Sequence, residues 1–182
     1  MKKRIIVGAT GASGMPLLIQ CLKLIRQDPD FESYLIPSAS ALLTLSQETG
    51  MTREDLAGLA DHVLDPASGS FKTQGMVIVP CSMKTVAGIH SGYTDNLILR
   101  AADVTLKEQR PLVLAARETP MSAVHLKNLY ELSMIPGVRI MPPMMTFYSR
   151  PKTIDDMVYH IAAKLLEPFG IEAKEYRRWN GL

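Results

Sequence analysis

Short apolar runs alternate along the chain with longer stretches in which apolar residues recur every three or four positions. The runs predict strands, and the periodic stretches predict amphipathic helices. We expect strands near Arg4–Val7, Tyr34–Pro37, Met76–Pro80, Leu112–Ala116 and Arg139–Met141. We expect helices near Met15–Arg26, Ala39–Glu48, Arg53–Ala60, Lys84–His90, Thr94–Glu108, Ser122–Met134 and Ile154–Leu166. Because this alternation is typical of βαβ units, it predicts an α/β, flavodoxin- or Rossmann-like fold of three layers with a doubly wound, mostly parallel sheet.

Composition narrows the class of protein. The chain has 182 residues, 47% of them hydrophobic, and no repeat divides it, so we interpret residues 1–182 as one domain with a C-terminal tail from about 171 to 182. The formal net charge is +2 with scattered basic residues, which argues against nucleic acid or an anionic membrane as a partner. The apolar stretch after Arg4 meets glycines too soon for a signal peptide or a membrane span, so we expect a cytoplasmic protein.

The cysteines and histidines indicate no metal site. Cys21 falls in a predicted helix and Cys81 at a predicted strand end, which gives neither a disulfide framework nor a paired metal motif. The four histidines are dispersed along the chain, and we expect structural or surface roles for them. They are His62, His90, His125 and His160.

The first predicted strand runs directly into a turn with three glycines, in the sequence GATGASG. Gly8, Gly11 and Gly14 allow a tight turn and a close approach of the backbone to an anion, and the next helix points its first N–H groups the same way. The spacing is GxxGxxG, which differs from the GxGxxG of dinucleotide-binding proteins and from the P-loop. The turn therefore indicates a phosphorylated ligand without specifying it, and a plain strand-to-helix turn is the alternative.

Polar residues also follow the other predicted strands. In doubly wound sheets the ligand lies outside the carboxyl ends of the strands. Ser38 follows the second strand, Ser82 to Thr85 follow the third, and Arg117 follows the fourth. Ser38 and Ser82 each have an alternative role as a helix N-cap, but several such strand ends in one chain favour a ligand site. The segment DPASGSFK, residues 65–72, is expected to be a loop at the sheet edge, with phosphate or flavin contact as one interpretation and a simple turn as the other.

Further candidates come from helix periodicity. Arg100, Asp103 and Lys107 share one face of a predicted helix, either as a solvated stripe or as part of a site. Lys164 stands at the edge of an apolar stripe, where it either reaches water or meets an anion. Tyr148 follows the last strand, where its phenol can hydrogen-bond a phosphate or simply pack as a half-buried aromatic.

A set of ordered motifs resembles the UbiX-type flavin prenyltransferases and the closely similar aromatic-acid decarboxylase accessory subunits. The motifs are GATGASG, GSF, PCSMKT, LRAADVTLKEQRPLVL, ARETP, FYxRP and the closing RRWNG. The resemblance extends nearly from end to end and is specific as a set. The chain departs from it between His62 and Ser68, where many relatives carry a longer segment.

The resemblance implies noncovalent binding of FMN and assembly as trimers packed into a dodecamer. The implied activity is transfer of a dimethylallyl group from dimethylallyl monophosphate to reduced FMN, closing a fourth ring between flavin N5 and C6. The product would serve a separate UbiD-like decarboxylase, in quinone biosynthesis or in aromatic-acid breakdown.

The resemblance also assigns residues by matching motifs. The FMN-binding positions it implies are Gly11, Ala12, Ser13, Ser38, Ser82, Met83, Lys84, Thr85 and Arg117. The prenyl-phosphate positions are Arg100, Tyr148 and Lys164. At the position of Lys164 the family often has arginine. The catalytic positions are Ser13, Glu48, Lys107 and Glu118.

These residue types suit the chemistry. Breaking an allylic C–O bond leaves charge on the departing phosphate, which Arg100, Lys107, Lys164, Tyr148 and the Ser13 hydroxyl would stabilise together. The sequence has no DDxxD-like acidic pair to hold magnesium, so we expect a metal-free cationic pocket. Glu118 and Glu48 are candidate acid/base groups, provided that the pKa of Glu118 is raised by its surroundings, and ion pairs with Arg117 or Lys107 are the alternative.

Two other functions stay open at this point. A flavin-dependent peptidyl-cysteine decarboxylase needs a histidine after the second strand, where this chain has Ser38, and a PASANT-like segment that is missing. A noncatalytic FMN-binding subunit of a 3-polyprenyl-4-hydroxybenzoate or phenolic acid carboxy-lyase is the second alternative. Methionines 83, 141, 144 and 145 suit an isoprenyl chain, a flavin ring or core packing, and Trp179 resembles a C-terminal aromatic that covers a neighbouring subunit's site.

Overall fold

The computed structural model describes residues 2–65 and 72–179, and its centre is a six-stranded, all-parallel sheet. The strands are β1 (Lys3–Ala9), β2 (Phe31–Pro37), β3 (His62–Val63), β4 (Gly75–Cys81), β5 (Leu112–Ala116) and β6 (Val138–Ile140). The helices are α1 (Met15–Gln27), α2 (Ala39–Thr49), α3 (Arg53–Ala57), α4 (Met83–His90), α5 (Leu97–Lys107), α6 (Ala123–Ser133), α7 (Ile154–Leu166) and a 3₁₀ turn, η1 (Glu167–Phe169).

The strand order β3-β2-β1-β4-β5-β6 places β1 at the centre. Ile6 of β1 is paired with Tyr34 of β2 on one side and with Met76 of β4 on the other. The chain moves outward from β1 to β3, then returns past β1 to build the other half of the sheet. The carboxyl ends of β1 and β4 therefore flank a topological switch point, where open α/β sheets bind ligands. This confirms the predicted fold class.

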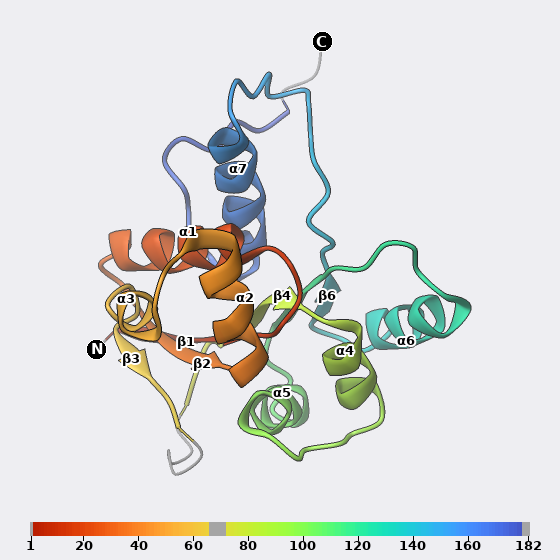
Figure 1. Ribbon diagram of the computed structural model, residues 1–182. Helices are drawn as coiled ribbons and strands as arrows, with labels where there is room; N and C mark the ends of the chain where they lie inside the picture. Colours follow the sequence, from red (N-terminus) through yellow and green to blue (C-terminus); the bar gives the residue numbers. More distant parts are fainter. Residues whose placement is uncertain (1, 66–71, 180–182) are drawn as a thin grey trace.

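Alternate residues of the central strands pack against opposite helical layers. Ile5 and Val7 belong to a core with α1, α2, α3 and α7, whereas Met76 and Ile78 belong to a core with α4, α5 and α6. Figure 1 shows α1 and α7 together on one side of the sheet and α5 on the other. Because helices cover both faces of the sheet, the strands consist almost entirely of apolar residues, which is typical of parallel sheets.

The predicted elements are confirmed, with shifts at their ends, and one strand was missed. Helix α5 begins at Leu97 because the Asn96 side chain caps it, three residues later than predicted. Helix α3 ends at Ala57, three residues earlier than predicted. Strand β3 contains only two residues, both exposed, so it leaves no hydrophobic pattern to detect.

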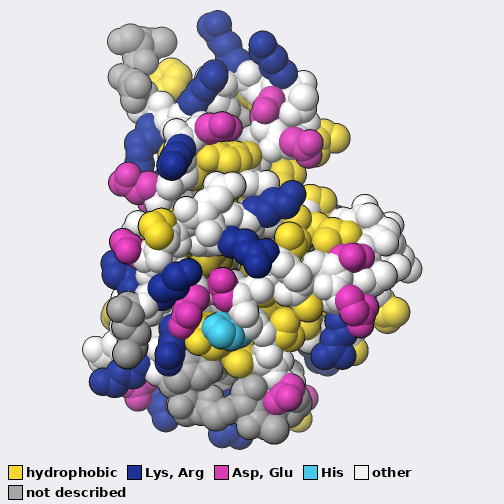
Figure 2. Space-filling view, turned by 90° about the vertical axis from the view of Figure 1, so that its left-hand side faces the viewer, with side chains coloured by type: hydrophobic (Ala, Val, Ile, Leu, Met, Phe, Trp, Pro, Cys, Tyr) yellow, Lys and Arg dark blue, Asp and Glu magenta, His cyan; other side chains and the backbone are white. Residues whose placement is uncertain are grey.

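Surface features agree with the charge pattern. Figure 2 shows Lys and Arg side chains interspersed with Asp and Glu over the face that it presents. In the described ranges, no helix is long and apolar enough to cross a membrane. Of the segment 65–72, only the two end residues are described, so the expected GSF contacts lie outside the described residues.

Candidate functional site

A cavity of about 310 Å³ opens at the carboxyl ends of β1, β2 and β4. It combines hydroxyl groups that follow these strands, the amine-bearing Lys84 and the first turn of α5. The lining residues are Thr10, Ile36, Pro37, Ser38, Ala39, Ser40, Leu64, Ser82, Lys84, Thr85, Asn96, Leu97, Ile98 and Leu99. Four predicted FMN-binding residues are therefore brought together at the switch point, and these are Ser38, Ser82, Lys84 and Thr85.

Ser38 lies at the joint between β2 and α2. Its backbone N–H donates to the Ala9 carbonyl at 2.9 Å, and its hydroxyl accepts from the Ala41 N–H at 3.1 Å. It is therefore an N-cap and a cavity-lining residue at once, so the two interpretations of the sequence are compatible. Gly11 packs against the same wall, since a Cβ at this position would lie 2.6 Å from the Cβ of Ser40.

Buried hydroxyls connect β1 to the start of α4. The Thr10 hydroxyl donates to the Pro80 carbonyl at 2.8 Å and accepts from the Ser82 N–H at 2.8 Å. The Ser82 hydroxyl in turn caps α4 by accepting from the Thr85 N–H at 3.4 Å. Met83, predicted to bind FMN, is buried in the core below α4 and does not line the cavity, because the helix turns it toward the sheet.

The glycine turn before α1 is occupied by the protein itself. The Glu48 carboxylate, from α2, accepts hydrogen bonds from the backbone N–H groups of Gly14 at 3.1 Å and Met15 at 2.8 Å. The side chain of Ser13 bonds to the same carboxylate. The expected phosphate cradle is thus already filled by an acidic side chain, which satisfies the exposed amides of the helix N-terminus. Ala12 lies in this turn, half-buried and outside the cavity lining.

Glu48 is held in its ionised form. Partial burial alone would raise the pKa of this carboxyl, but hydrogen bonds from Ser13, Met15 and Gly14 and the charge of Arg117 bring the pKa below its ordinary value. A carboxyl with a lowered pKa is a poor proton donor at neutral pH. The predicted acid role of Glu48 therefore has no support in this arrangement, whereas a proton-accepting or positioning role does.

Arg117 and Glu118 directly follow β5 at the same edge of the sheet. The Arg117 N–H donates to the Cys81 carbonyl at 3.0 Å, which ties this segment to the end of β4. The Glu118 carboxylate accepts from the N–H of Thr119 at 3.0 Å. In the part of the chain that the structure describes, Glu118 forms no ion pair with Arg117 or with Lys107.

A second, smaller cavity of about 150 Å³ brings together two predicted prenyl-phosphate residues, Tyr148 and Lys164. Its remaining wall is largely apolar and includes Met141 and Met144. The ammonium group of Lys164 currently pairs with Glu167, which also pairs with Arg178. Soft methionine side chains beside a phenol and an amine suit a ligand with an apolar chain and an anionic end.

An aromatic group closes one side of this cavity. The Tyr148 hydroxyl lies 3.1 Å from Nε2 of His160, and the Tyr148 ring meets Trp179 edge-on at a centroid distance of 5.7 Å. Burial, followed by the charge of Lys164, lowers the pKa of His160. Burial also raises the pKa of Tyr176 to about 12, with the neighbouring Tyr148 adding to the effect. Both groups are therefore held in their uncharged forms at neutral pH, and Trp179 packs on its own chain.

The remaining predicted cations lie elsewhere. Arg100 and Lys107 are exposed on α5, whose opposite face packs into the core with α4 and α6. Lys164 lies on α7, which covers the other face of the sheet. Within one chain the sheet separates Lys107 from Lys164, so the expected single cluster of Arg100, Lys107, Lys164, Tyr148 and Ser13 is not formed. Periodicity identified the helix face correctly but cannot report which side of the sheet a helix covers.

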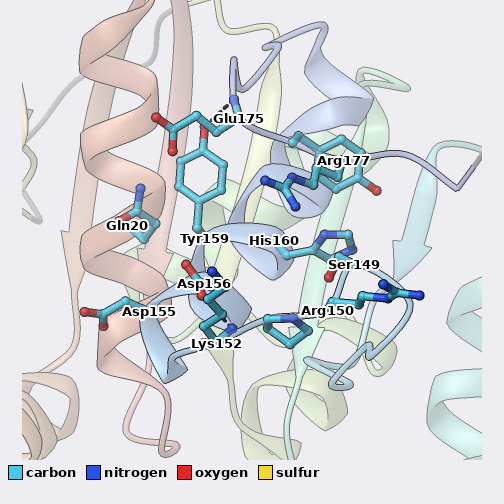
Figure 3. A pocket seen from close by; sticks show the side chains of 12 residues that line it. Gln20, Ser149, Arg150, Lys152, Asp155, Asp156, Tyr159, His160, Glu175 and Arg177 are labelled. Carbon is cyan, nitrogen blue, oxygen red and sulfur yellow. Dashed lines mark hydrogen bonds between the residues drawn. The ribbon is translucent and has the colours of Figure 1, made fainter.

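A larger cavity of about 490 Å³ lies between α1, the start of α7 and the C-terminal segment. None of the residues proposed above line it. In Figure 3, Arg150 and Arg177 lie on one side, and Asp155 and Glu175 on the other. Asp156 accepts hydrogen bonds from the backbone N–H groups of residues 152 and 153 and so is committed to capping α7. The charges of this cavity largely balance, so it lacks the positive excess that a phosphate requires.

Sequence reasoning missed three polar contributors to the switch-point cavity. Thr10 stands inside the glycine turn, and its position directly after a strand was the available signal. Ser40 and Asn96 also line the cavity. Their signals were weak, because a serine in a first helical turn and an asparagine before a helix are ordinary capping residues.

Comparison with known proteins places this geometry in a class. The sequence model of the Flavoprotein family matches residues 1–166, so the chain is an α/β flavoprotein by family. "Flavin prenyltransferase LpdB" of Lactiplantibacillus plantarum is 49% identical over 186 residues, which cover 98% of this chain and 99% of the relative. The chain belongs to the family of UbiX-like flavin prenyltransferases.

Two solved structures are similar over the whole chain. A dodecameric FMN-dependent UbiX-like decarboxylase from Escherichia coli O157:H7 superposes with a TM-score of 0.93 at 48% identity, covering 98% of this chain and all of the other. AnUbiX (PadA1), solved in complex with FMN and dimethylallyl pyrophosphate, has a TM-score of 0.94 at 42% identity and covers 100% of both chains.

Proposed function

We propose that this protein transfers a dimethylallyl group from a dimethylallyl phosphate to reduced FMN. The switch-point cavity carries the proposal. It presents the hydroxyls of Ser38, Ser82 and Thr85 and the amine of Lys84 at the N-terminus of α4, a donor set that suits a phosphate monoester. Its volume, about 310 Å³, is at the lower end of the range for ligand pockets, so it accommodates one part of FMN.

We infer the orientation of FMN from the groups that already occupy the two helix N-termini. The amides of the glycine turn are occupied by Glu48, whereas the hydroxyls after β2 and β4 face the cavity. We therefore assign the FMN phosphate to the cavity and the flavin ring to the side of Ser13, Glu48 and Arg117. Reduced FMN, when bound, supplies the nucleophilic ring atoms. Glu48, ionised and bonded to Ser13, is then the group placed to accept a proton.

The prenyl phosphate is assigned to the cavity of Tyr148 and Lys164. Met141 and Met144 would contact a five-carbon chain, and the phenol and the amine would stabilise the charge that develops on the departing phosphate. Lys164 would exchange its pairing with Glu167 for the phosphate. Glu118 is proposed as a proton donor or acceptor beside the departing phosphate.

We propose that Arg100 and Lys107 complete the prenyl-phosphate site of a neighbouring subunit. Because they lie on the opposite helical layer from Lys164, they reach a prenyl phosphate only from a neighbouring chain. A homo-oligomer, such as the dodecamer of the E. coli relative, provides such neighbours. Mixing a Lys107→Ala protein with a Lys164→Ala protein is expected to restore activity in part of the sites. If subunit exchange is verified and the mixture is still no more active than either variant alone, the result would contradict a site shared between subunits.

The use of the product is inferred from the family resemblance alone. We propose that the prenylated flavin is passed to a UbiD-like decarboxylase, and that the protein works in the cytoplasm. A second candidate function is a noncatalytic FMN-binding subunit of an aromatic-acid carboxy-lyase. The similar E. coli structure is called an FMN-dependent decarboxylase, which links this fold to decarboxylation and keeps that candidate in the test.

The deciding experiment is an anaerobic incubation of the protein with reduced FMN and either dimethylallyl monophosphate or diphosphate. The extracted flavin is weighed by mass spectrometry. We expect a flavin heavier by one five-carbon unit, and a rate reduced by about a hundredfold or more in Glu118→Gln, in line with the usual size of acid–base contributions. Glu54→Gln, an exposed glutamate on α3, is the matched control and is expected to behave as wild type. FMN bound at full occupancy but unmodified would favour the noncatalytic subunit.

A further inference from the structure

Thr10 is a buried hydroxyl residue at the switch point with no assigned role. It directly follows β1, and only 3% of its surface is exposed. Its Oγ1 donates to the Pro80 carbonyl at 2.8 Å and accepts from the Ser82 N–H at 2.8 Å. Its own backbone N–H also donates to the Pro80 carbonyl at 3.2 Å. A single side chain thus joins the end of β1 to the residues on either side of Cys81.

These bonds lie where the regular sheet stops. The pairing of β1 with β4 ends at Gly8 and Ile78, and the pairing of β4 with β5 changes register between Ile78 and Cys81. The backbone from Val79 onward therefore has no continuous ladder against β1. Thr10 replaces the ladder at this point and fixes the direction in which the chain leaves β4.

The position of Ser82 determines the geometry of the cavity wall. The Ser82 hydroxyl lies 3.1 Å from the Thr85 hydroxyl and accepts from the Thr85 N–H at 3.4 Å. Thr10, Ser82 and Thr85 all line the cavity. A displacement of the Ser82 backbone would therefore move both hydroxyls and the first amides of α4 together.

We infer that Thr10 is a positioning residue for phosphate binding. It holds the Ser82 backbone so that the hydroxyls of Ser82 and Thr85 converge on one anion. The inference rests on the proposed assignment of the FMN phosphate to this cavity. This role requires a hydroxyl, because valine has the same shape but leaves the Ser82 N–H without its partner and the Pro80 carbonyl with only the backbone N–H of residue 10. Serine keeps both hydrogen bonds.

The test compares FMN with riboflavin, which carries the same ring without the phosphate. Dissociation constants are measured by flavin fluorescence for wild type, Thr10→Val and Thr10→Ser. We expect Thr10→Val to weaken FMN binding about tenfold, the usual effect of losing a buried hydrogen bond, while riboflavin binding stays nearly unchanged. Thr10→Ser is expected to retain the preference for FMN.

Thr105→Val is the matched control. Thr105 is also buried, at 2% exposure, and its hydroxyl donates to the Ala101 carbonyl at 2.7 Å inside α5, away from the cavity. It is expected to leave both dissociation constants unchanged. Equal losses for FMN and riboflavin in Thr10→Val, or equal losses in the two valine variants, would overturn the inference in favour of general destabilisation.

Amide hydrogen exchange separates this inference from the proposed function. In the ligand-free protein, Thr10→Val is expected to speed exchange at the N–H groups of Ser82 and Thr85, and Thr105→Val is not. Unchanged exchange at Ser82 would overturn the role of Thr10, whatever the protein binds. Wild type that binds FMN no better than riboflavin would instead contradict the phosphate assignment, and exchange would still decide whether Thr10 holds Ser82.

Discussion

Two helices of this protein begin at the same edge of the sheet and on either side of the switch point, yet their N-termini differ in what they offer a ligand. The N-terminus of α1 follows the glycine turn. Its backbone amides, which have no partner inside the helix, donate to the Glu48 carboxylate. The N-terminus of α4 follows Ser82, carries only a hydroxyl cap, and opens onto the cavity. The more conspicuous sequence signature therefore marks the N-terminus that is already satisfied.

From this difference we expect a helix N-terminus to bind an anion only where its amides lack an acidic partner within the protein. A capping hydroxyl leaves the dipole uncompensated, whereas a carboxylate neutralises it. The first of the four predictions that follow disturbs the cavity wall beside these helices, and the other three alter the N-terminus of α4 or that of α1.

The largest effect is expected from Gly11→Ala. The added Cβ would lie 2.6 Å from the Ser40 Cβ and 3.3 Å from its carbonyl carbon, so the start of α2 must move. We expect the free energy of unfolding to fall by about 2 kcal/mol, within the usual cost of overpacking, and FMN binding to weaken. Denaturant unfolding measures the first and flavin fluorescence the second. Gly58→Ala is the control, because there the new Cβ meets backbone oxygens at ordinary distances; equal losses would contradict the Gly11 contact.

Removing the hydroxyl cap of α4 comes next. Ser82→Ala is expected to lower the free energy of unfolding by about 1 kcal/mol, the usual value of an N-cap, and to weaken FMN binding about tenfold. Ser122→Ala removes the same kind of cap from α6, where the hydroxyl accepts from the His125 N–H at 3.2 Å. This control is expected to lose the same stability but to keep its FMN affinity, as measured by fluorescence titration. Loss of affinity in both variants would show that the open N-terminus of α4 has no special role.

Opening the N-terminus of α1 makes it resemble that of α4. Glu48→Ala frees the amides of Gly14 and Met15 and is expected to lower the free energy of unfolding by about 1 kcal/mol. Inorganic phosphate, compared with chloride at equal ionic strength, is expected to restore part of this loss in thermal unfolding. Phosphate that binds at the open N-terminus of α4 stabilises all three proteins alike, so Glu48→Ala is expected to gain more from phosphate than wild type or Glu48→Gln, whose amide oxygen still accepts hydrogen bonds. Equal rescue of all three proteins would contradict the model of a filled anion site.

The smallest effect is a dependence on pH. The pKa of Glu48 is lower in the folded protein than its ordinary value, so its ionised form stabilises the fold above the unfolded pKa, about 4.3, and this contribution is lost as the pH falls through the folded pKa. The stability difference between wild type and Glu48→Gln is therefore expected to shrink below about pH 4. It amounts to a few tenths of a kcal/mol because the side chain is exposed and screened. Urea unfolding at a series of pH values measures it, and a constant difference would contradict the assignment.

Much of the fold was predictable because local patterns and tertiary structure agree. The apolar run of β4 and the periodic stripe of α7 each point to one element, and burial of both faces of the sheet explains the runs. Ser38 and Ser82 were identified because strand ends converge in any parallel sheet. Strand β3 escaped prediction because two exposed residues carry no pattern.

The sequence by itself determined the α/β class, the family and the ring of hydroxyls after β2 and β4, since these depend on local periodicity and on residues next to strand ends. Only the tertiary structure decided what fills each N-terminus. Glu48 lies 33 residues from Met15, and no local rule predicts that the two meet. It also decided that Lys107 and Lys164 lie on opposite helical layers, because the chain returns from one face of the sheet to the other between β6 and α7, and that crossing depends on the packing of the whole molecule.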